Sequence, residues 1–183
     1  RRRLPHCERI VSLPHAAPKW TSARFPWVLL RSWLSPLPVD LWKCRVPALQ
    51  REAARLMASQ NIDLCVADFL VAMPNVPAPA PVVYFSHNVE YVIWRRLRDH
   101  ERRAWRRALL EIEWRKMRRA EAEACRRARL TLAVSPQDQS LLQALAPRAA
   151  IRAIPTGVDV DYFAPRDEEV NEDELVYVGS MDW

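Results

Sequence analysis

The chain has 183 residues, of which half are hydrophobic, and a net charge of +6. This length holds one domain with a sizeable core, and the hydrophobic share excludes disorder as the default state. Only two glycines are present, so the sequence lacks the Gly-rich first turn that a complete dinucleotide-binding fold requires.

The predicted strands and helices alternate along the chain. In chain order they are a strand at 9–13, a Trp-rich helix at 25–33, a helix at 48–59, a strand at 62–67, a proline-rich loop at 74–81, an apolar strand at 82–85, a helix from about residue 88, a long helix at 102–127, a strand at 130–134, a helix at 136–146 and a strand at 150–154. Alternation of this kind, with apolar strands, predicts an α/β fold with a Rossmann-like, doubly wound parallel sheet.

The cysteines and the apolar segments argue against a metal site and a membrane span. The four cysteines show no Cys-x-x-Cys spacing and the histidines do not cluster, so we expect neither a metal nor a required disulfide. The apolar stretch 25–42 is interrupted by Arg31, Pro36, Pro38 and Asp40, which argues against a transmembrane helix. The basic start is not followed by an apolar segment, so we expect no signal peptide and a cytoplasmic protein.

Residues 154–183 predict the exit from one domain and the entry to another. Pro155 cannot extend a strand, and Gly157 supplies a turn residue that can take a positive φ. Six acidic residues between 167 and 174 indicate a solvated linker. The apolar run 175–178, closed by Gly179 and Ser180, is typical of a buried parallel strand that enters a ligand-binding loop. We therefore expect a partial domain at 1–154, a linker at 155–174 and the truncated start of a second domain at 175–183.

Five segments together resemble the family 4 glycosyltransferases, enzymes with two Rossmann-like domains in the GT-B arrangement. They are the Pro-x-Gly-Val-Asp crossing at 155–159, the strand at 81–88 that ends in His-Asn, the Glu-containing helix at 111–125, the strand and Ser-x-x-Asp turn at 132–138, and the loop at 179–183. The resemblance covers roughly residues 60–183 and depends on the order and spacing of these motifs. It implies an acceptor-side GT-B domain, incomplete at its start, followed by the first strand of a nucleotide-sugar domain.

The resemblance also implies a reaction. It is the transfer of a sugar from a nucleotide-sugar donor to a hydroxyl acceptor, with retention at the anomeric carbon, in bacterial polysaccharide or glycolipid synthesis. No metal or other cofactor is expected, and the acceptor can be lipid-linked. A chain that ends just inside its second domain is expected to be inactive alone. The alternative from the residues is a non-catalytic basic binding module for nucleic acid or anionic lipid.

His87 is the candidate catalytic residue. A histidine after a buried strand is by itself a hydrogen-bonded loop residue. The resemblance instead implies a histidine beside the transferred sugar, where it donates a hydrogen bond to a sugar hydroxyl or to charge at the anomeric centre. Asn88, next to it, is expected to bind substrate and is placed to cap the following helix.

The remaining candidates are expected to bind substrate. Asp68 follows a strand and is either a contact for the acceptor hydroxyl or a solvated loop acid. Ser135 opens a capping box with Asp138, which explains the serine, although the helix N-terminus behind it also favours an anion. Gly157 belongs to the domain crossing. At Gly179 and Ser180, backbone amides are expected to approach the donor diphosphate, but Gly179 also serves as an ordinary strand terminator.

The segment 95–129 is strongly basic, with thirteen Arg and one Lys against six acidic residues. Its predicted apolar stripe comprises Trp105, Ala108, Leu109, Ile112, Met117, Ala120 and Ala124. Glu111–Arg115 and Glu123–Arg127 are expected to pair at i,i+4 spacing. Three interpretations remain open: a solvated helix face, a peripheral contact with anionic lipid at the inner face of a membrane, and nucleic-acid binding. We do not expect nucleic acid, because no motif that reads RNA or DNA accompanies the charge.

Overall fold

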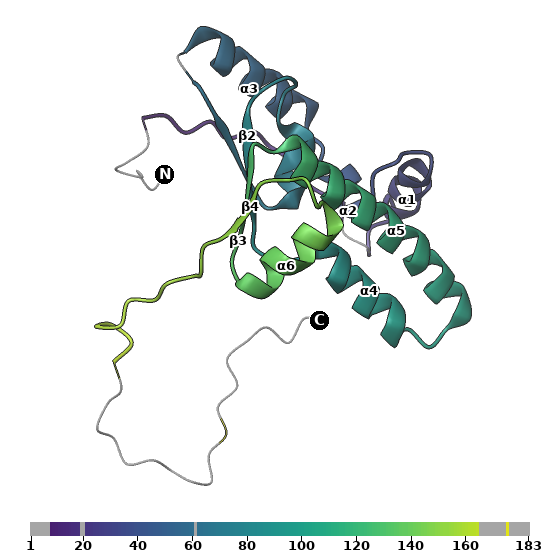
Figure 1. The fold of residues 1–183 in the computed structure, drawn as a ribbon. Coiled ribbons are helices and arrows are strands. Elements are labelled where there is room, and N and C mark those ends of the chain that lie inside the picture. The colour runs from purple at the N-terminus through teal and green to yellow at the C-terminus, as the bar shows by residue number, and fades with distance from the viewer. Residues whose placement is uncertain (1–7, 19–20, 61, 165–174, 176–183) are drawn as a thin grey trace.

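The computed structural model describes residues 8–18, 21–60, 62–164 and 175 (Figure 1). Its elements are α1 (Phe25–Trp33), α2 (Val39–Lys43), α3 (Pro47–Ser59), β1 (Cys65–Asp68), the 3-10 helix η1 (Leu70–Asn75), β2 (Val82–Ser86), α4 (Glu90–His100), α5 (Ala104–Arg127), β3 (Leu130–Ala133), α6 (Pro136–Leu145) and β4 (Ile151–Ala153).

The described strands form one parallel sheet in the order β1-β2-β3-β4. In register, Ala67 lies beside Tyr84, Tyr84 beside Thr131, and Thr131 beside Ile151. Each crossover brings the chain back to the same end of the sheet, so the carboxyl ends of all four strands share one edge. The predicted α/β class with a Rossmann-like parallel sheet is therefore confirmed.

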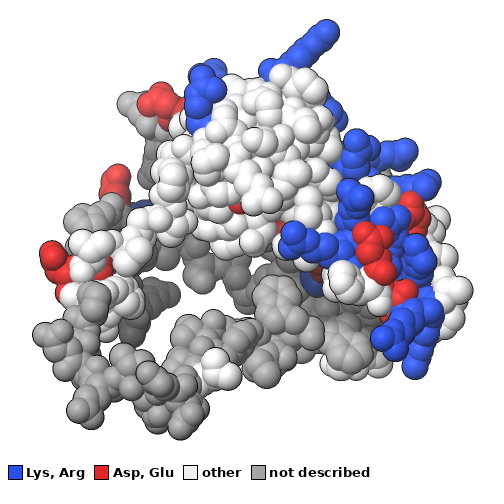
Figure 2. All heavy atoms as spheres, turned by 60° about the horizontal axis from the view of Figure 1, so that its bottom comes forward, with Lys and Arg blue, Asp and Glu red and all other residues white. Residues whose placement is uncertain are grey.

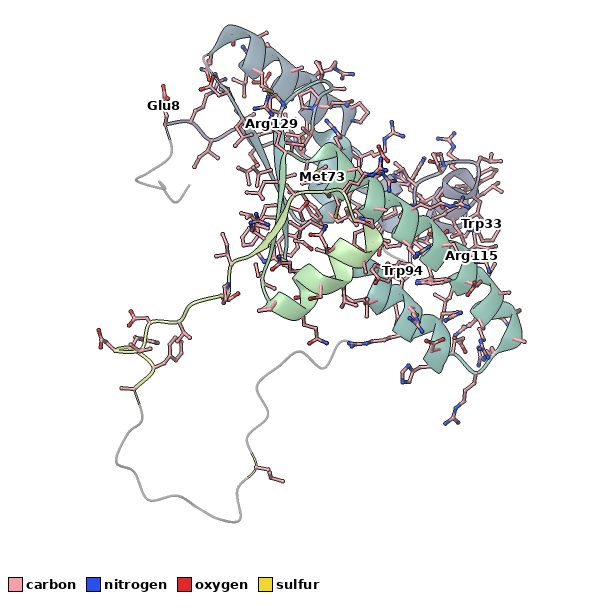
Figure 3. The ribbon with its side chains drawn as sticks, viewed as in Figure 1. Glu8, Trp33, Met73, Trp94, Arg115 and Arg129 are labelled. Carbon is pink, nitrogen blue, oxygen red and sulfur yellow. The ribbon has the colours of Figure 1, made fainter. Side chains whose placement is uncertain are left out.

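One face of this sheet carries the core. Along β2 the buried residues alternate with half-buried ones, so Val82, Tyr84 and Ser86 point to the same face. Figure 1 shows α5 and α6 on one side of the sheet. The core cluster includes Met117 and Cys125 of α5 together with Tyr84 and Met73, which is labelled in Figure 3. The long helix α5 is therefore the element that anchors the helical layer to the strands.

The helix α5 has 24 residues whereas the longest described strand has 5, and Figure 1 shows its first half lying beyond the strands. There it packs against α4, to which a short connection joins it, and the two run side by side (Figure 1). This position contradicts part of the predicted apolar stripe, because Trp105 is 61% and Ile112 is 46% exposed. The buried face carries Glu113, Met117, Glu121, Ala122, Ala124 and Cys125. Two acids therefore occupy positions at which an apolar pattern predicts hydrophobic residues.

Two other predicted strands need correction, two short helices were missed, and one predicted strand stays untested. Residues 9–13 form no strand, and Ile10 is largely exposed there because no neighbouring strand pairs with it. The strand predicted at 62–67 is paired only from Cys65 to Asp68. The helices α2 and η1 were not predicted; both are short, and prolines at or within them hide the signal of a regular helix. The strand expected at 175–178 lies outside the described residues except for Leu175, and the predicted domain boundaries stay predictions.

Candidate active site at the carboxyl ends of the strands

The carboxyl ends of β1 and β2 bring together two residues that are far apart in the sequence. His87 follows β2 directly, and Asp68 is the last residue of β1, where it pairs in register with Phe85. The ring nitrogen Nε2 of His87 lies 2.6 Å from Oδ1 of Asp68. The side chain of His87 is 32% exposed and that of Asp68 is 63% exposed. The sequence predicted both residues as site residues but did not predict that they form a pair.

Two aromatic rings fix the orientation of the imidazole. Phe69 stacks on His87 with 4.0 Å between ring centroids, and Phe85 lies tilted against it at 4.4 Å. Phe69 has φ of 66°, a conformation that side-chain-bearing residues rarely adopt and that costs roughly 1–3 kcal/mol. Its amide donates to the carbonyl oxygen of Phe85 at 3.0 Å. The chain therefore turns sharply after Asp68 and places an aromatic ring on the histidine.

The paired ring has one nitrogen bound and one available. An ionised Asp68 can only accept a hydrogen bond, so Nε2 carries the proton and donates it. Nδ1 is therefore the nitrogen left to meet a substrate. The carboxylate orients the ring and also stabilises positive charge that develops on it, as in other histidine–carboxylate pairs. This arrangement suits hydrogen bonding and proton handling at Nδ1.

Asn88 does not cap the next helix, which corrects the prediction. The helix α4 starts after Val89, no side chain of its own cap position bonds its amides, and Asn88 is exposed. The capping group comes instead from α5: Oε1 and Oε2 of Glu121 accept from the amides of Glu90 and Tyr91, both at 2.9 Å. A partner that is about thirty residues away leaves no local pattern, so sequence reasoning missed Glu121. The only available signal was an acid on the buried face of a helix.

Ser135 forms the predicted cap of α6. Its Oγ accepts from the amide of Asp138 at 3.0 Å and donates to Oδ2 of the same residue at 2.9 Å. Pro136 occupies the first helical turn. The serine thus has a structural role that accounts for its presence, and no contact in the described part of the chain joins it to the His87–Asp68 pair. Its role in substrate binding stays a prediction.

The glycines contribute less than expected to the described site. Gly157 could take a positive φ but does not, and a Cβ added there would meet nothing within 4 Å. The segment after β4 is exposed and has no regular secondary structure at this point, so it requires no glycine conformation. Gly179 and Ser180 lie outside the described residues, and their contact with a diphosphate stays a prediction.

A groove lies beside Asn88, between α4 and the start of α5. It encloses about 890 Å³ and combines apolar side chains with a cationic rim. The apolar members are Ile93, Leu97 and Leu110, and the charged or titratable members are Arg96, His100, Glu101, Arg102, Arg103 and Arg106. Figure 2 shows Lys and Arg gathered at the same end of the molecule, with a few acids among them.

Several of the basic residues in this hairpin are engaged by acids. Arg98 and Arg115, the second of which is labelled in Figure 3, both contact Glu111 at 2.7 Å, which confirms the predicted pairing of Glu111 with Arg115. Glu123 pairs with Arg126 at 2.9 Å and not with Arg127. Arg127 instead donates to backbone carbonyls between η1 and β2. That position holds the loop before β2 and removes Arg127 from the free basic surface.

The described residues bear on cofactors and membranes in two ways. They contain no group of three or more His, Cys, Asp or Glu side chains arranged to hold a metal ion. Within the same residues, no helix is both long and apolar enough to span a bilayer.

Comparison with known proteins assigns the chain to a family. The class that the geometry defines is a Rossmann-like α/β domain with polar residues gathered where its parallel strands end. The family model described as Glycosyltransferase Family 4 matches residues 8–162. The chain therefore belongs to this family, and its function is of the glycosyltransferase type, with a sugar donor and an acceptor as partners in general terms. No curated protein and no solved structure matches the chain.

Proposed function

We propose that this chain carries the acceptor-side half of a retaining glycosyltransferase, which moves a sugar from a nucleotide-sugar donor to a hydroxyl acceptor. In this reaction the bond between the anomeric carbon and the diphosphate oxygen breaks, a bond to the acceptor oxygen forms, and the hydroxyl proton of the acceptor passes to the departing diphosphate. The single observation that carries the proposal, beyond family membership, is the His87–Asp68 pair at the carboxyl ends of β1 and β2. Ligands of parallel α/β sheets bind at that edge.

His87 acts in this proposal through its free Nδ1. With the proton on Nε2, the neutral ring presents Nδ1 as an acceptor, so this nitrogen accepts a hydrogen bond from a hydroxyl of the transferred sugar and favours the positive charge that develops at the anomeric carbon as the diphosphate departs. Asp68 and the Phe69 ring hold the imidazole so that Nδ1 needs no reorganisation during the reaction. Because the roles are polarisation and positioning, no covalent intermediate on His87 is required.

The acceptor is proposed to approach along the groove between α4 and α5. The groove begins at Asn88, next to His87, and its arginines attract an anionic headgroup while its apolar side chains contact the chain below that headgroup. A lipid-linked acceptor at the inner face of a membrane, in polysaccharide or glycolipid synthesis, has this chemistry. The exposed Trp105 at the start of α5 suits the same interfacial position.

A transfer assay tests the proposal. The whole gene product that contains residues 1–183 is incubated with radiolabelled UDP-, GDP- and ADP-sugars and a lipid extract as acceptor. Release of the nucleoside diphosphate together with label in the lipid fraction is expected for one donor class. If the folded protein leaves every donor intact and binds none of them, the proposed function is wrong.

A further inference from the structure

Two buried glutamates of α5 each accept the first amides of another helix. Glu113 is 4% exposed and accepts from the amide of Val39, the first residue of α2, at 2.7 Å. Glu121 is fully buried and accepts the first two amides of α4. Amides in the first turn of a helix have no partner within that helix, so an acid that meets them fixes where the helix begins.

The loop that carries His87 is held at both of its ends. At its start, Ser86 Oγ donates to the carbonyl oxygen of Asn88 at 2.8 Å and lies 3.2 Å from the hydroxyl of Tyr84. At its end, the loop enters α4, whose first amides are bound by Glu121. Only Asn88 and Val89 separate His87 from the helix that Glu121 holds. A shift of the first turn of α4 therefore moves His87 relative to Asp68 and Phe69.

We propose that Glu121 is a positioning residue for His87: by holding the amides of Glu90 and Tyr91, it keeps the imidazole against Asp68 with Nδ1 directed at the substrate. This inference rests on the proposed function, because it assumes that His87 meets the sugar. Glu121 itself touches no substrate, since its side chain is fully buried behind α4.

The charge of Glu121 is expected to control how firmly it holds α4. Burial raises the pKa of Glu121 to about 7, the bonds from Tyr91 and Glu90 oppose this, and the charges of Glu90 and Asp138 add to it. The titratable groups around it come from β2, α4, α5 and α6, and they are Tyr84, Glu90, Tyr91, Cys125 and Asp138. An ionised carboxylate accepts both amides more strongly than the neutral acid. In an open state in which only the first turn of α4 unfolds and Glu121 stays buried, the two bonds that lower its pKa are lost while burial still raises it. The closed state therefore binds the proton less tightly than this open state and gains as pH rises through 7, whereas complete unfolding also removes the burial.

Amide exchange measured by NMR tests the contact directly in the chain as it stands. The protection factors of Glu90 and Tyr91 are compared in the wild type, Glu121→Gln, Glu121→Ala and the control Glu123→Gln, which alters an exposed acid two residues away on the same helix. We expect protection to rise from pH 6 to pH 8 in the wild type and the control. It should be independent of pH in Glu121→Gln and at least tenfold lower in Glu121→Ala.

The position of His87 is followed by the nuclear Overhauser effect between its ring and that of Phe69. The stacked rings give a strong effect in the wild type and the control, and we expect it to weaken in Glu121→Ala together with the loss of protection. If both signals are the same in all four proteins, the inference is overturned. Should Glu121→Ala not fold, Glu121→Gln carries the test, because a loss of the pH dependence without unfolding is still expected.

Activity of the whole gene product separates this inference from the proposed function. Glu121→Gln should lower kcat several-fold with little change in donor KM, and it should flatten the pH profile between 6 and 8. If His87→Ala lowers kcat and Glu121→Gln changes neither kcat nor the profile, Glu121 does not position His87. If His87→Ala itself leaves kcat unchanged, the proposed role of His87 is wrong, whatever the amide exchange shows.

Discussion

At the scale of single residues, the site consists of a histidine whose second nitrogen is bound to a carboxylate. Its 2.6 Å contact with Asp68 and the ring of Phe69 together determine which nitrogen faces outward. Asp68 was named as a candidate from its position after a strand, and His87 from the same kind of position together with the family resemblance. Their pairing was not predicted, because two residues that are nineteen positions apart meet only once the register of β1 and β2 is known.

Replacement of Asp68 by Asn tests whether the pair needs the carboxylate charge, because the two side chains have nearly the same shape. An amide oxygen still accepts from Nε2, but without the charge that strengthens the bond, so kcat of the whole gene product should fall about tenfold. Asp63→Asn, which alters another acid that precedes β1, is the control and should leave kcat unchanged. Equal rates for wild type and Asp68→Asn would show that the carboxylate is a solvated loop acid.

Glu121 offers a stability prediction that is separate from catalysis. Its pKa is raised to about 7 in the folded chain, against an ordinary value near 4.5, so the folded state binds the proton more tightly than the unfolded state. The free energy of unfolding must therefore fall as pH rises between these values, by at most roughly 3 kcal/mol. Urea denaturation at several pH values should show this slope in the wild type and a smaller one in Glu121→Gln. Equal slopes in both proteins would contradict the assigned ionisation.

At the scale of elements, the sequence predicted correctly the contacts that form between neighbouring residues. The cap of α6 is one example, since Ser135, Pro136 and Asp138 are neighbours in the sequence and the predicted bonds are formed. The cap of α4 is the opposite case, because a local cap was predicted at Asn88, whereas Val89 occupies the cap position and Glu121 of α5 binds the first amides of the helix. The predicted apolar stripe of α5 was partly wrong for a related reason. The period of the stripe indicated a helix, but it could not indicate that the first half of this helix projects beyond the sheet.

The α6 cap should have a measurable effect on stability. Ser135→Ala removes the oxygen that accepts the Asp138 amide, and the free energy of unfolding should fall by about 1 kcal/mol. Ser140→Ala on the same helix is the matched control, because that exposed hydroxyl only bonds back to the carbonyl of Pro136. The control should be neutral or slightly stabilising, since alanine has the higher helix propensity. A loss as large in Ser140→Ala as in Ser135→Ala would refute the assigned cap.

At the scale of the whole molecule, the hydrophobic core and the basic groove lie in two different regions. The sheet, with α6 and the second half of α5 packed on it, holds the core and the His87–Asp68 pair, whereas α4 and the first half of α5 hold the groove with its cationic rim (Figures 1 and 2). The sequence predicted the basic segment and its length. It could not predict the groove, which depends on how two helices pack.

The membrane proposal predicts salt-sensitive binding at the groove. The chain should sediment with vesicles that contain anionic lipid, and binding should be lost at several-fold higher salt or when Arg102, Arg103, Arg106 and Arg107 are changed to Gln. A control with the same change in net charge replaces the exposed Arg45, Arg51, Arg148 and Arg152, which lie on other elements, and should retain most of the binding. Neutral vesicles should bind poorly.

Two outcomes would contradict the membrane proposal. If both quadruple variants lose binding equally, net charge is responsible and the groove is not. If the chain binds a single strand or a duplex of nucleic acid selectively at physiological salt and binds no lipid, the basic binding module is the better account of the hairpin.

The central claim is that His87 assists sugar transfer, and its direct measurement is the effect of His87→Ala on the steady-state kinetics of the whole gene product. A histidine that stabilises the transition state more than the bound donor predicts a loss in kcat of roughly 10²-fold or more with little change in donor KM. His15→Ala, which removes an exposed histidine bonded only to the carbonyl of Lys43, should retain full activity. An unchanged kcat in folded His87→Ala would contradict the account and leave His87 as a hydrogen-bonded residue of a loop.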